Sequence, residues 1–91
     1  MRIKVHNMQS PSSGRDVANQ FVIETEDGRY FQSYNTVIAR IPNSGPVELD
    51  RDDWEYSRTT ARYRNLFLGC NTDEVRARVK SGRYKLVNLN P

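Results

Sequence analysis

Hydrophobic and polar residues alternate with a period of two along most of the first 50 residues, which is the pattern of half-buried strands. The alternation begins in residues 1–7, where Ile3 and Val5 share one face. It recurs in the runs 21–25, 29–33, 37–41 and 47–50. Turn-forming residues separate the runs, and the stretch 9–16 consists of little else. The pattern predicts a largely antiparallel sheet of roughly five strands with one apolar face, and places 1–7 at its edge.

The clearest hairpin signal lies in residues 21–33, where a Glu-Asp-Gly sequence at 26–28 separates two strand-like runs. A two-residue Asp-Gly loop would place Ile23 opposite Gln32. A three-residue loop, with the glycine in the left-handed conformation, would place Ile23 opposite Phe31. We favour the three-residue loop because it pairs apolar residues on the same face.

The main helix is predicted between a capping residue, Ser57, and a terminating glycine, Gly69. At about 100° per residue, one arc of this helix holds Thr59, Thr60, Tyr63, Leu66 and Phe67. The opposite arc holds Arg58, Arg62 and Asn65. We expect the first arc to be buried against the sheet, with Trp54 covering the core, because a helix of roughly 11 residues is marginal alone in water. The outer face of the helix is basic.

A short second helix is predicted between Thr72 as the capping residue and Gly82 just beyond its end. Acidic residues at 73–74 and the basic Lys80 agree with the helix dipole. A final strand is expected at 84–87. The predicted fold class is therefore α+β, a mostly antiparallel sheet of about five strands covered by one main and one short helix, in a single domain of residues 1–91.

Composition narrows the cellular setting. The chain has 91 residues, of which 36% are hydrophobic, and it carries a single cysteine. No apolar run approaches the roughly 20 residues that span a bilayer. A lone cysteine fits a reducing compartment. We expect a cytoplasmic protein with no membrane partner.

The net charge of +3 is distributed unevenly along the chain. Residues 1–56 carry six basic and nine acidic side chains, a net of −3, whereas residues 57–91 carry eight basic and two acidic ones, a net of +6. A basic block of this kind indicates a nucleic-acid partner, an acidic protein surface or simply a solvated helix face.

The sequence shows no arrangement that is typical of an active site. His6 is the only histidine, so paired-histidine catalysis within one chain is excluded. Cys70 follows a helix C-terminus, where the dipole disfavours a thiolate. The carboxylates of residues 50–55 lack the spacing of a calcium loop. We therefore expect no enzymatic activity, no bound metal and no cofactor.

The strongest candidate for a functional surface is the set of arginine and tyrosine residues around the two predicted helices. Protein interfaces favour such mixtures, and tyrosine and arginine side chains can also stack on nucleic-acid bases. The candidate partner-binding residues are Tyr56, Arg58, Arg62, Arg64, Arg76, Arg78, Lys80 and Tyr84, with Arg83 and Lys85 nearby.

Three segments, 29–39, 54–60 and 63–68, resemble a family of small uncharacterised proteins encoded by bacteriophages, prophages and plasmids. The similarity extends from about Asn19 onward. The resemblance implies an accessory protein expressed in the cytoplasm of a bacterial host cell. It also implies action by binding, as in proteins that block host defence or modify host machinery.

The sequence is compatible with three functions. The favoured one is a protein that binds and inhibits or redirects a host or defence protein. A nucleic-acid-binding module is the alternative; it is less favoured because +6 over 35 residues is modest and the −3 half repels a wrapped backbone. A structural virion component would have to self-associate through its hairpin edges.

Overall fold

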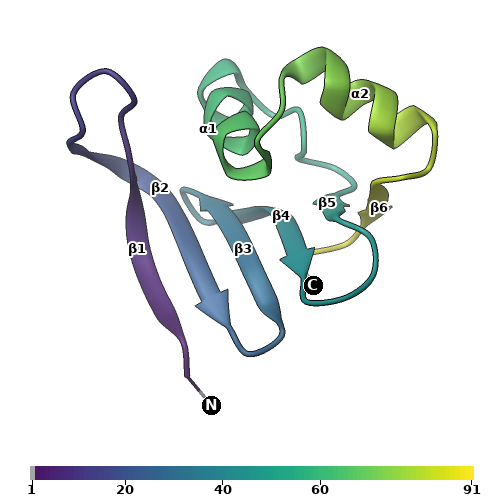
Figure 1. Ribbon diagram of the computed structural model, residues 1–91, viewed down its shortest axis with the longest axis horizontal. Coiled ribbons are helices and arrows are strands. Elements are labelled where there is room, and N and C mark those ends of the chain that lie inside the picture. Colours follow the sequence, from purple (N-terminus) through teal and green to yellow (C-terminus); the bar gives the residue numbers. More distant parts are fainter. Residues whose placement is uncertain (1) are drawn as a thin grey trace.

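The computed structural model describes residues 2–91, which form a sheet of six strands and two helices (Figure 1). The strands are β1 (Lys4–Gln9), β2 (Asp16–Thr25), β3 (Gly28–Ser33), β4 (Thr36–Pro42), β5 (Glu48–Asp50) and β6 (Lys85–Val87). The helices, α1 (Arg58–Leu68) and α2 (Thr72–Lys80), lie between β5 and β6 in sequence. Neither helix has the length and apolar character needed to cross a membrane.

The sheet confirms the predicted α+β class. Its strands lie side by side in chain order, with β1 to β5 antiparallel and β6 parallel to β5. The first residue of the expected strand 1–7 lies outside the described residues. Residues 4–7 belong to β1, which continues to Gln9 and lies at one edge of the sheet, as predicted.

The core forms where one row of side chains crosses the sheet beneath α1. Val22, Phe31, Ala39 and Leu49 stand opposite one another on successive strands, and all four are buried. On α1, Phe67 packs on Phe31 with the ring centroids 5.9 Å apart. The helix therefore covers the apolar face that the alternation of residues predicted.

The hairpin between β2 and β3 differs from both predicted registers. Thr25 pairs with Gly28, so Ile23 stands opposite Tyr30. The Thr25 hydroxyl closes this two-residue turn, accepting from Asp27 N (3.1 Å) and donating to Gly28 O (3.1 Å). Gly28 is a ladder residue with φ +152°, and an added Cβ there would collide with the carbonyl oxygen of Ile41. The glycine is needed because β4 approaches it, and it lies outside the loop.

The predicted burial of Ile3 and Val5 is wrong. Their side chains are 58% and 60% exposed. Val5 pairs with Ile23, which directly follows the core residue Val22 in β2 and so points to the opposite face of the sheet. Ile3 and Val5 thus face away from the helices.

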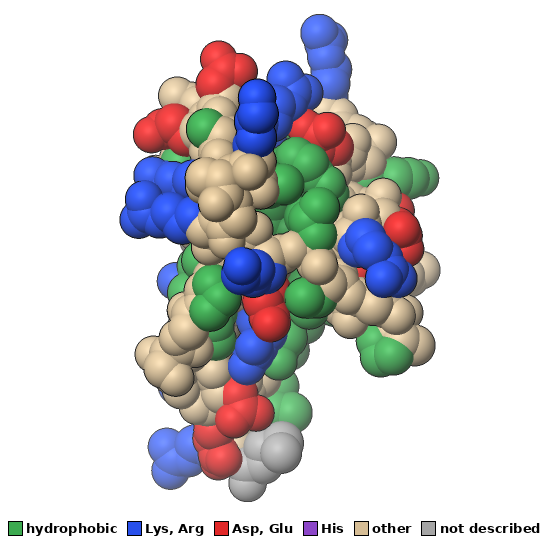
Figure 2. Space-filling view, turned by 90° about the vertical axis from the view of Figure 1, so that its right-hand side faces the viewer, with side chains coloured by type: hydrophobic (Ala, Val, Ile, Leu, Met, Phe, Trp, Pro, Cys, Tyr) green, Lys and Arg blue, Asp and Glu red, His purple; other side chains and the backbone are tan. Residues whose placement is uncertain are grey.

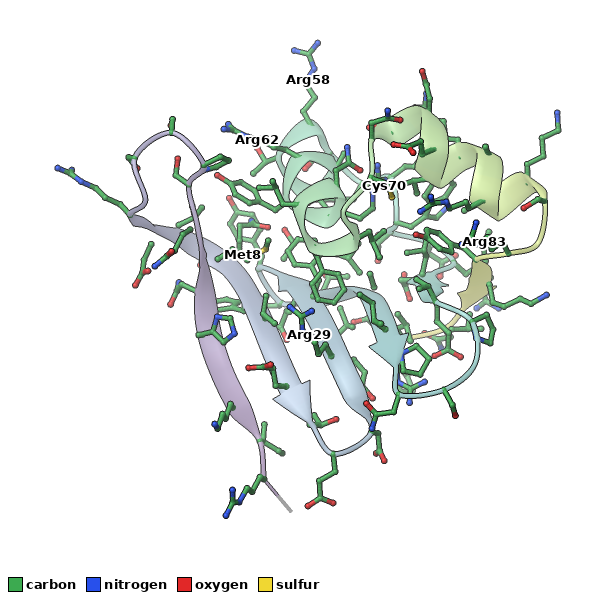
Figure 3. The ribbon with its side chains drawn as sticks, viewed as in Figure 1. Met8, Arg29, Arg58, Arg62, Cys70 and Arg83 are labelled. Carbon is green, nitrogen blue, oxygen red and sulfur yellow. The ribbon has the colours of Figure 1, made fainter. Side chains whose placement is uncertain are left out.

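β1 and β2 form the first hairpin of the chain, and its second strand is longer than the sequence suggested. β2 begins at Asp16, ahead of the predicted run 21–25, and bends at Asn19, which has φ +65°. The bend turns the hairpin toward the helices, where Met8 and Val17 pack against the core. Figure 3 shows the Met8 side chain directed toward α1.

Asp50, at the end of β5, is a buried carboxylate that organises the chain on both sides of the helices. It accepts hydrogen bonds from the backbone N–H groups of Asp52 (3.2 Å), Asp53 (3.0 Å) and Leu89 (2.9 Å). Burial acts to raise the pKa of Asp50, but these hydrogen bonds, with a further one from the Asn90 side chain, hold it below its usual value. The ionised carboxylate joins the turn before α1 to the C-terminal segment.

Asp50→Asn should lower the free energy of unfolding at pH 7 by about 2–3 kcal/mol, because an amide accepts these bonds less strongly than a carboxylate. The folded pKa is depressed, so the stabilisation is present above the unfolded pKa of about 3.9 and is lost as the pH falls through the folded value. The variant should therefore lose less stability than the wild type on acidification below about pH 4. Urea unfolding at several pH values measures both effects.

Asp52→Asn is the matched control, because the Asp52 side chain is 73% exposed. We expect a change within about 0.5 kcal/mol, as for an ordinary surface substitution. Equal losses in the two variants would show that Asp50 contributes no special stabilisation.

Candidate protein-binding surface

α1 begins and ends as its sequence predicted. The Ser57 hydroxyl accepts a hydrogen bond from Thr60 N (3.1 Å). Gly69 adopts the left-handed conformation at φ +71°, and its N–H donates to Asn65 O (2.8 Å). Both ends of the helix are thus fixed by local hydrogen bonds.

The buried side of α1 is rotated relative to the predicted arc. Thr60, Tyr63 and Phe67 are buried as expected, but the fourth buried residue is Arg64. Leu66 is 45% exposed, and the predicted burial of Leu66 and Thr59 is wrong. Leu66 instead continues the outer face of the helix, four residues beyond Arg62.

Arg64 is fully buried, with 0% of its surface exposed, so its prediction as a partner-binding residue is wrong. Its Nη1 donates to the backbone oxygen of Trp54 (2.7 Å), and its Nη2 donates to Asn65 Oδ1 (2.8 Å). The guanidinium also lies over the Trp54 ring, 5.7 Å from its centroid. Arg64 therefore fastens the segment before α1 to the helix.

No carboxylate within residues 2–91 accepts a hydrogen bond from Arg64. Burial lowers the pKa of the Arg64 guanidinium, and the charge of Glu55 opposes this shift. Neutral acceptors and an aromatic ring thus take the place of the usual acidic partner.

Arg78 and Tyr84 form a pair instead of an open surface. Arg78 Nη1 donates to the Tyr84 hydroxyl (2.9 Å), which also lies 3.8 Å from Cys70 Sγ. Tyr84 is buried, and burial raises the pKa of its hydroxyl. The prediction that Tyr84 contributes a stacking surface is wrong, because its ring packs beneath Arg78.

Two of the predicted partner-binding residues, Arg76 and Lys80, are exposed on α2 but differ in their contacts. Arg76 is engaged, with its Nε 2.6 Å from Glu55 Oε1, whereas Lys80 has no charged partner among the described side chains. α2 itself is capped by Asn71, which exchanges hydrogen bonds with Glu74 (2.8 and 2.9 Å), and not by Thr72 as predicted.

The outer face of α1 brings together Arg58, Arg62 and Leu66, which lie one turn apart and which we call the α1 ridge. Figure 3 shows Arg58 and Arg62 directed away from the sheet. A groove of about 500 Å³ lies beside the C-terminal half of the ridge, lined by Arg62, Leu66 and Cys70 on one side and Pro11 on the other. We call it the ridge groove.

Sequence reasoning missed Pro11 and Leu66 as surface residues. The bend of the first hairpin at Asn19 accompanies the approach of Pro11 to α1, and no periodic pattern encodes that approach. The exposure of Leu66 could have been predicted only by knowing that Arg64 lies on the buried side of α1.

Tyr56 is 72% exposed and belongs to a second cleft, of about 460 Å³, between the start of α1 and the β3–β4 turn. Tyr34, which is also exposed, lines the same cleft and has the unusual φ of +55° for a residue with a side chain. The cleft is otherwise lined largely by hydroxyl groups, including those of Ser57 and Thr59. Tyr56 thus lies near the α1 ridge, as the sequence suggested.

The two residues considered as a catalytic pair, His6 and Cys70, lie in different parts of the fold. His6 is on β1, with Nε2 3.5 Å from Glu24 Oε2, while Cys70 is buried beyond the end of α1. Within residues 2–91, no group of three or more His, Cys, Asp or Glu side chains is arranged to hold a metal ion.

Comparison with known proteins identifies one similarity. The model of a family of unknown function, DUF8033, matches residues 3–82. No curated protein and no solved structure matches the chain.

Arg64→Ala should lower the free energy of unfolding by about 3 kcal/mol or more, because it leaves a cavity and removes the donors to Trp54 O and Asn65. Arg64→Lys should recover little of this loss, since a point charge cannot reproduce the planar guanidinium. Arg62→Ala, on the outer face of the same helix, should change stability by less than about 0.5 kcal/mol. Urea unfolding followed by Trp54 fluorescence measures all three, and full rescue by lysine would contradict this account.

Proposed function

We propose that this chain, which belongs to the family of unknown function DUF8033, is a small binding protein that inhibits or redirects another protein. Its binding surface would be the α1 ridge together with the ridge groove. This is binding without catalysis, and the placement of His6 on β1 and Cys70 beyond the end of α1 supports that part of the proposal.

The observation that supports a protein partner most directly is the exposure of Leu66 beside Arg62. Leu66 is 45% exposed, and both side chains line the groove of about 500 Å³ that Pro11 closes on the far side. Arginine and apolar anchors that fit a pocket are the residues that carry most of the energy at protein interfaces. An apolar side chain of a partner fits this groove, and an acidic one fits the arginines of the ridge.

Nucleic acid fits the same side less well. Of the predicted basic residues, Arg64 is buried, Arg76 is paired with Glu55 and Arg78 is bonded to Tyr84. Figure 2 looks at the side where α2 ends and shows Lys and Arg side chains interspersed with Asp and Glu. A continuous positive track, which phosphate-backbone binding uses, is not seen in that view.

The setting of this function follows from the resemblance to proteins of bacteriophages, prophages and plasmids. In that setting the partner would be a host or defence protein in the bacterial cytoplasm. The exposed α1 ridge suits a role in which surface contact alone changes the activity of the partner.

A partner captured from bacterial lysate by the tagged protein should be retained after nuclease treatment. Arg62→Ala and Leu66→Ala should each weaken its binding by about 2 kcal/mol, roughly 30-fold, because both side chains lie at the ridge groove. Isothermal titration with the purified partner measures the loss. Lys4→Ala, an exposed charge on β1, is the control and should leave the affinity nearly unchanged.

The nucleic-acid alternative makes the opposite prediction. Nuclease treatment would abolish capture, and an oligonucleotide would bind with submicromolar affinity. The logarithm of its binding constant would fall with the logarithm of salt concentration with a slope steeper than about −3. That result would replace the protein-binding proposal.

A further inference from the structure

A cleft of about 330 Å³ lies between the first turns of α1 and α2, and we call it the two-helix cleft. Ser57 and Arg58 line it from the start of α1, and Thr72 and Arg76 line it from the start of α2. Glu55, Ala61 and Arg64 complete the lining. The cleft is separate from the ridge groove, which lies at the other end of α1.

The charges around the two-helix cleft are unbalanced. Among the lining residues, three guanidinium groups, those of Arg58, Arg64 and Arg76, stand against one carboxylate, that of Glu55. The formal excess is therefore two positive charges. The charge of Asp73 also acts on Arg76, from outside the lining. The N-terminal ends of both helices add partial positive charge to the same space.

The charge of Arg64 is the one that water screens least, because the side chain is not exposed to solvent. It is fully buried, and its hydrogen bonds within residues 2–91 all go to neutral oxygens. Among charged groups, Glu55 has the largest effect on Arg64, but its Oε1 already lies 2.6 Å from Arg76 Nε. A buried cation that is bonded only to neutral groups is further stabilised by an anion held near it.

Hydrogen-bond donors are also available in the two-helix cleft. The Arg58 side chain makes no hydrogen bond or ion pair with any described residue. The Thr72 hydroxyl accepts from Asn65 Nδ2 (2.9 Å), but its own proton has no acceptor in residues 2–91. Arg76 uses Nε for Glu55 and keeps its two terminal nitrogens for another partner.

We propose that the two-helix cleft binds a phosphate monoester group, with Arg58, Arg76 and the Thr72 hydroxyl as direct donors. Arg64 acts from the floor of the cleft through its charge. A phosphate monoester carries between about −1.5 and −2 at pH 7, which matches the excess of two positive charges. Arginine is suited to such a ligand because its planar donors match two phosphate oxygens at once.

Inorganic phosphate is the probe for this site, and Trp54 is the reporter. Trp54 is the only tryptophan in the chain, and its ring lies 5.7 Å from the Arg64 guanidinium carbon. Titration at constant low ionic strength should change Trp54 fluorescence saturably, with a Kd of about 1 mM or below. No saturable response up to about 20 mM phosphate would overturn the proposal.

Three substitutions give the response its specificity. Arg58→Gln should weaken phosphate binding roughly tenfold, because it removes one charged donor. Arg62→Gln removes the same charge from the same helix outside the cleft, and should change the Kd less than about twofold. Glu55→Gln should tighten binding by about threefold or more, since it removes the competing carboxylate. Equal effects of Arg58→Gln and Arg62→Gln, or weaker binding by Glu55→Gln, would overturn the site.

The source of the phosphate can be distinguished by further titrations. A nucleoside monophosphate and a phosphoserine peptide both present the proposed group, and the tighter ligand identifies whether a small molecule or a modified protein is the source. An oligonucleotide without a terminal phosphate offers only diesters, with one charge each, and should bind more weakly than either. Its binding most tightly of the three would overturn the monoester assignment. None of these titrations depends on the protein-binding proposal.

Discussion

Arg64 joins three parts of the chain: the segment before α1, α1 itself and the start of α2. Its guanidinium donates to Trp54 O (2.7 Å) in the segment before α1 and to Asn65 (2.8 Å) within the helix. It also lies 3.5 Å from Thr72 Oγ1 at the start of α2. Because a buried cation without its acceptors costs several kcal/mol, these segments cannot separate while Arg64 remains inside.

The inward position of Arg64 also sets which residues α1 presents to solvent. Thr60, Tyr63, Arg64 and Phe67 occupy the side that faces the sheet. A helix has room for only one such side, so Leu66 is displaced to the rim, where it stands next to Arg62. The exposed ridge therefore accompanies the inward position of residue 64.

Asp50 plays the corresponding part for the sheet with the opposite charge. The Asp50 carboxylate accepts hydrogen bonds from the backbone N–H groups of residues 52, 53 and 89, whereas Arg64 donates to backbone and side-chain oxygens. The two buried charges do not pair with each other within the described structure. Each is compensated by local dipoles, which fixes the segment between β5 and α1 at both ends.

The features that follow from local physics could be predicted from the sequence. Strand alternation gave the α+β class, and the caps at Ser57 and Gly69 gave the limits of α1. The β2–β3 register could not be predicted, because Gly28 is required by the approach of Ile41 in a neighbouring strand, which is a tertiary contact. The predicted burial of Ile3 and Val5 was wrong for a similar reason, because alternation alone does not say which face of a strand the helices cover.

The candidate site shows the same division between local and tertiary information. Exposure of Arg58 and Arg62 follows from helical spacing, which the sequence contains. The burial of Arg64 and Tyr84 does not, because a charged or hydroxyl-bearing side chain enters a core only when tertiary partners satisfy it. Trp54 and Arg78 supply those partners from other segments.

The free edge of the sheet bears on which side of the molecule meets other chains. β1 exposes Ile3 and Val5, which would favour pairing with a second copy. In a two-fold antiparallel pairing, however, residues on one face of β1 meet the same face of the other copy. Lys4 and His6 share that strand on the face opposite Val5, so basic side chains would stand against one another. The two faces of the edge strand therefore act in opposite directions: the apolar face favours pairing with a second copy, and the basic face opposes it.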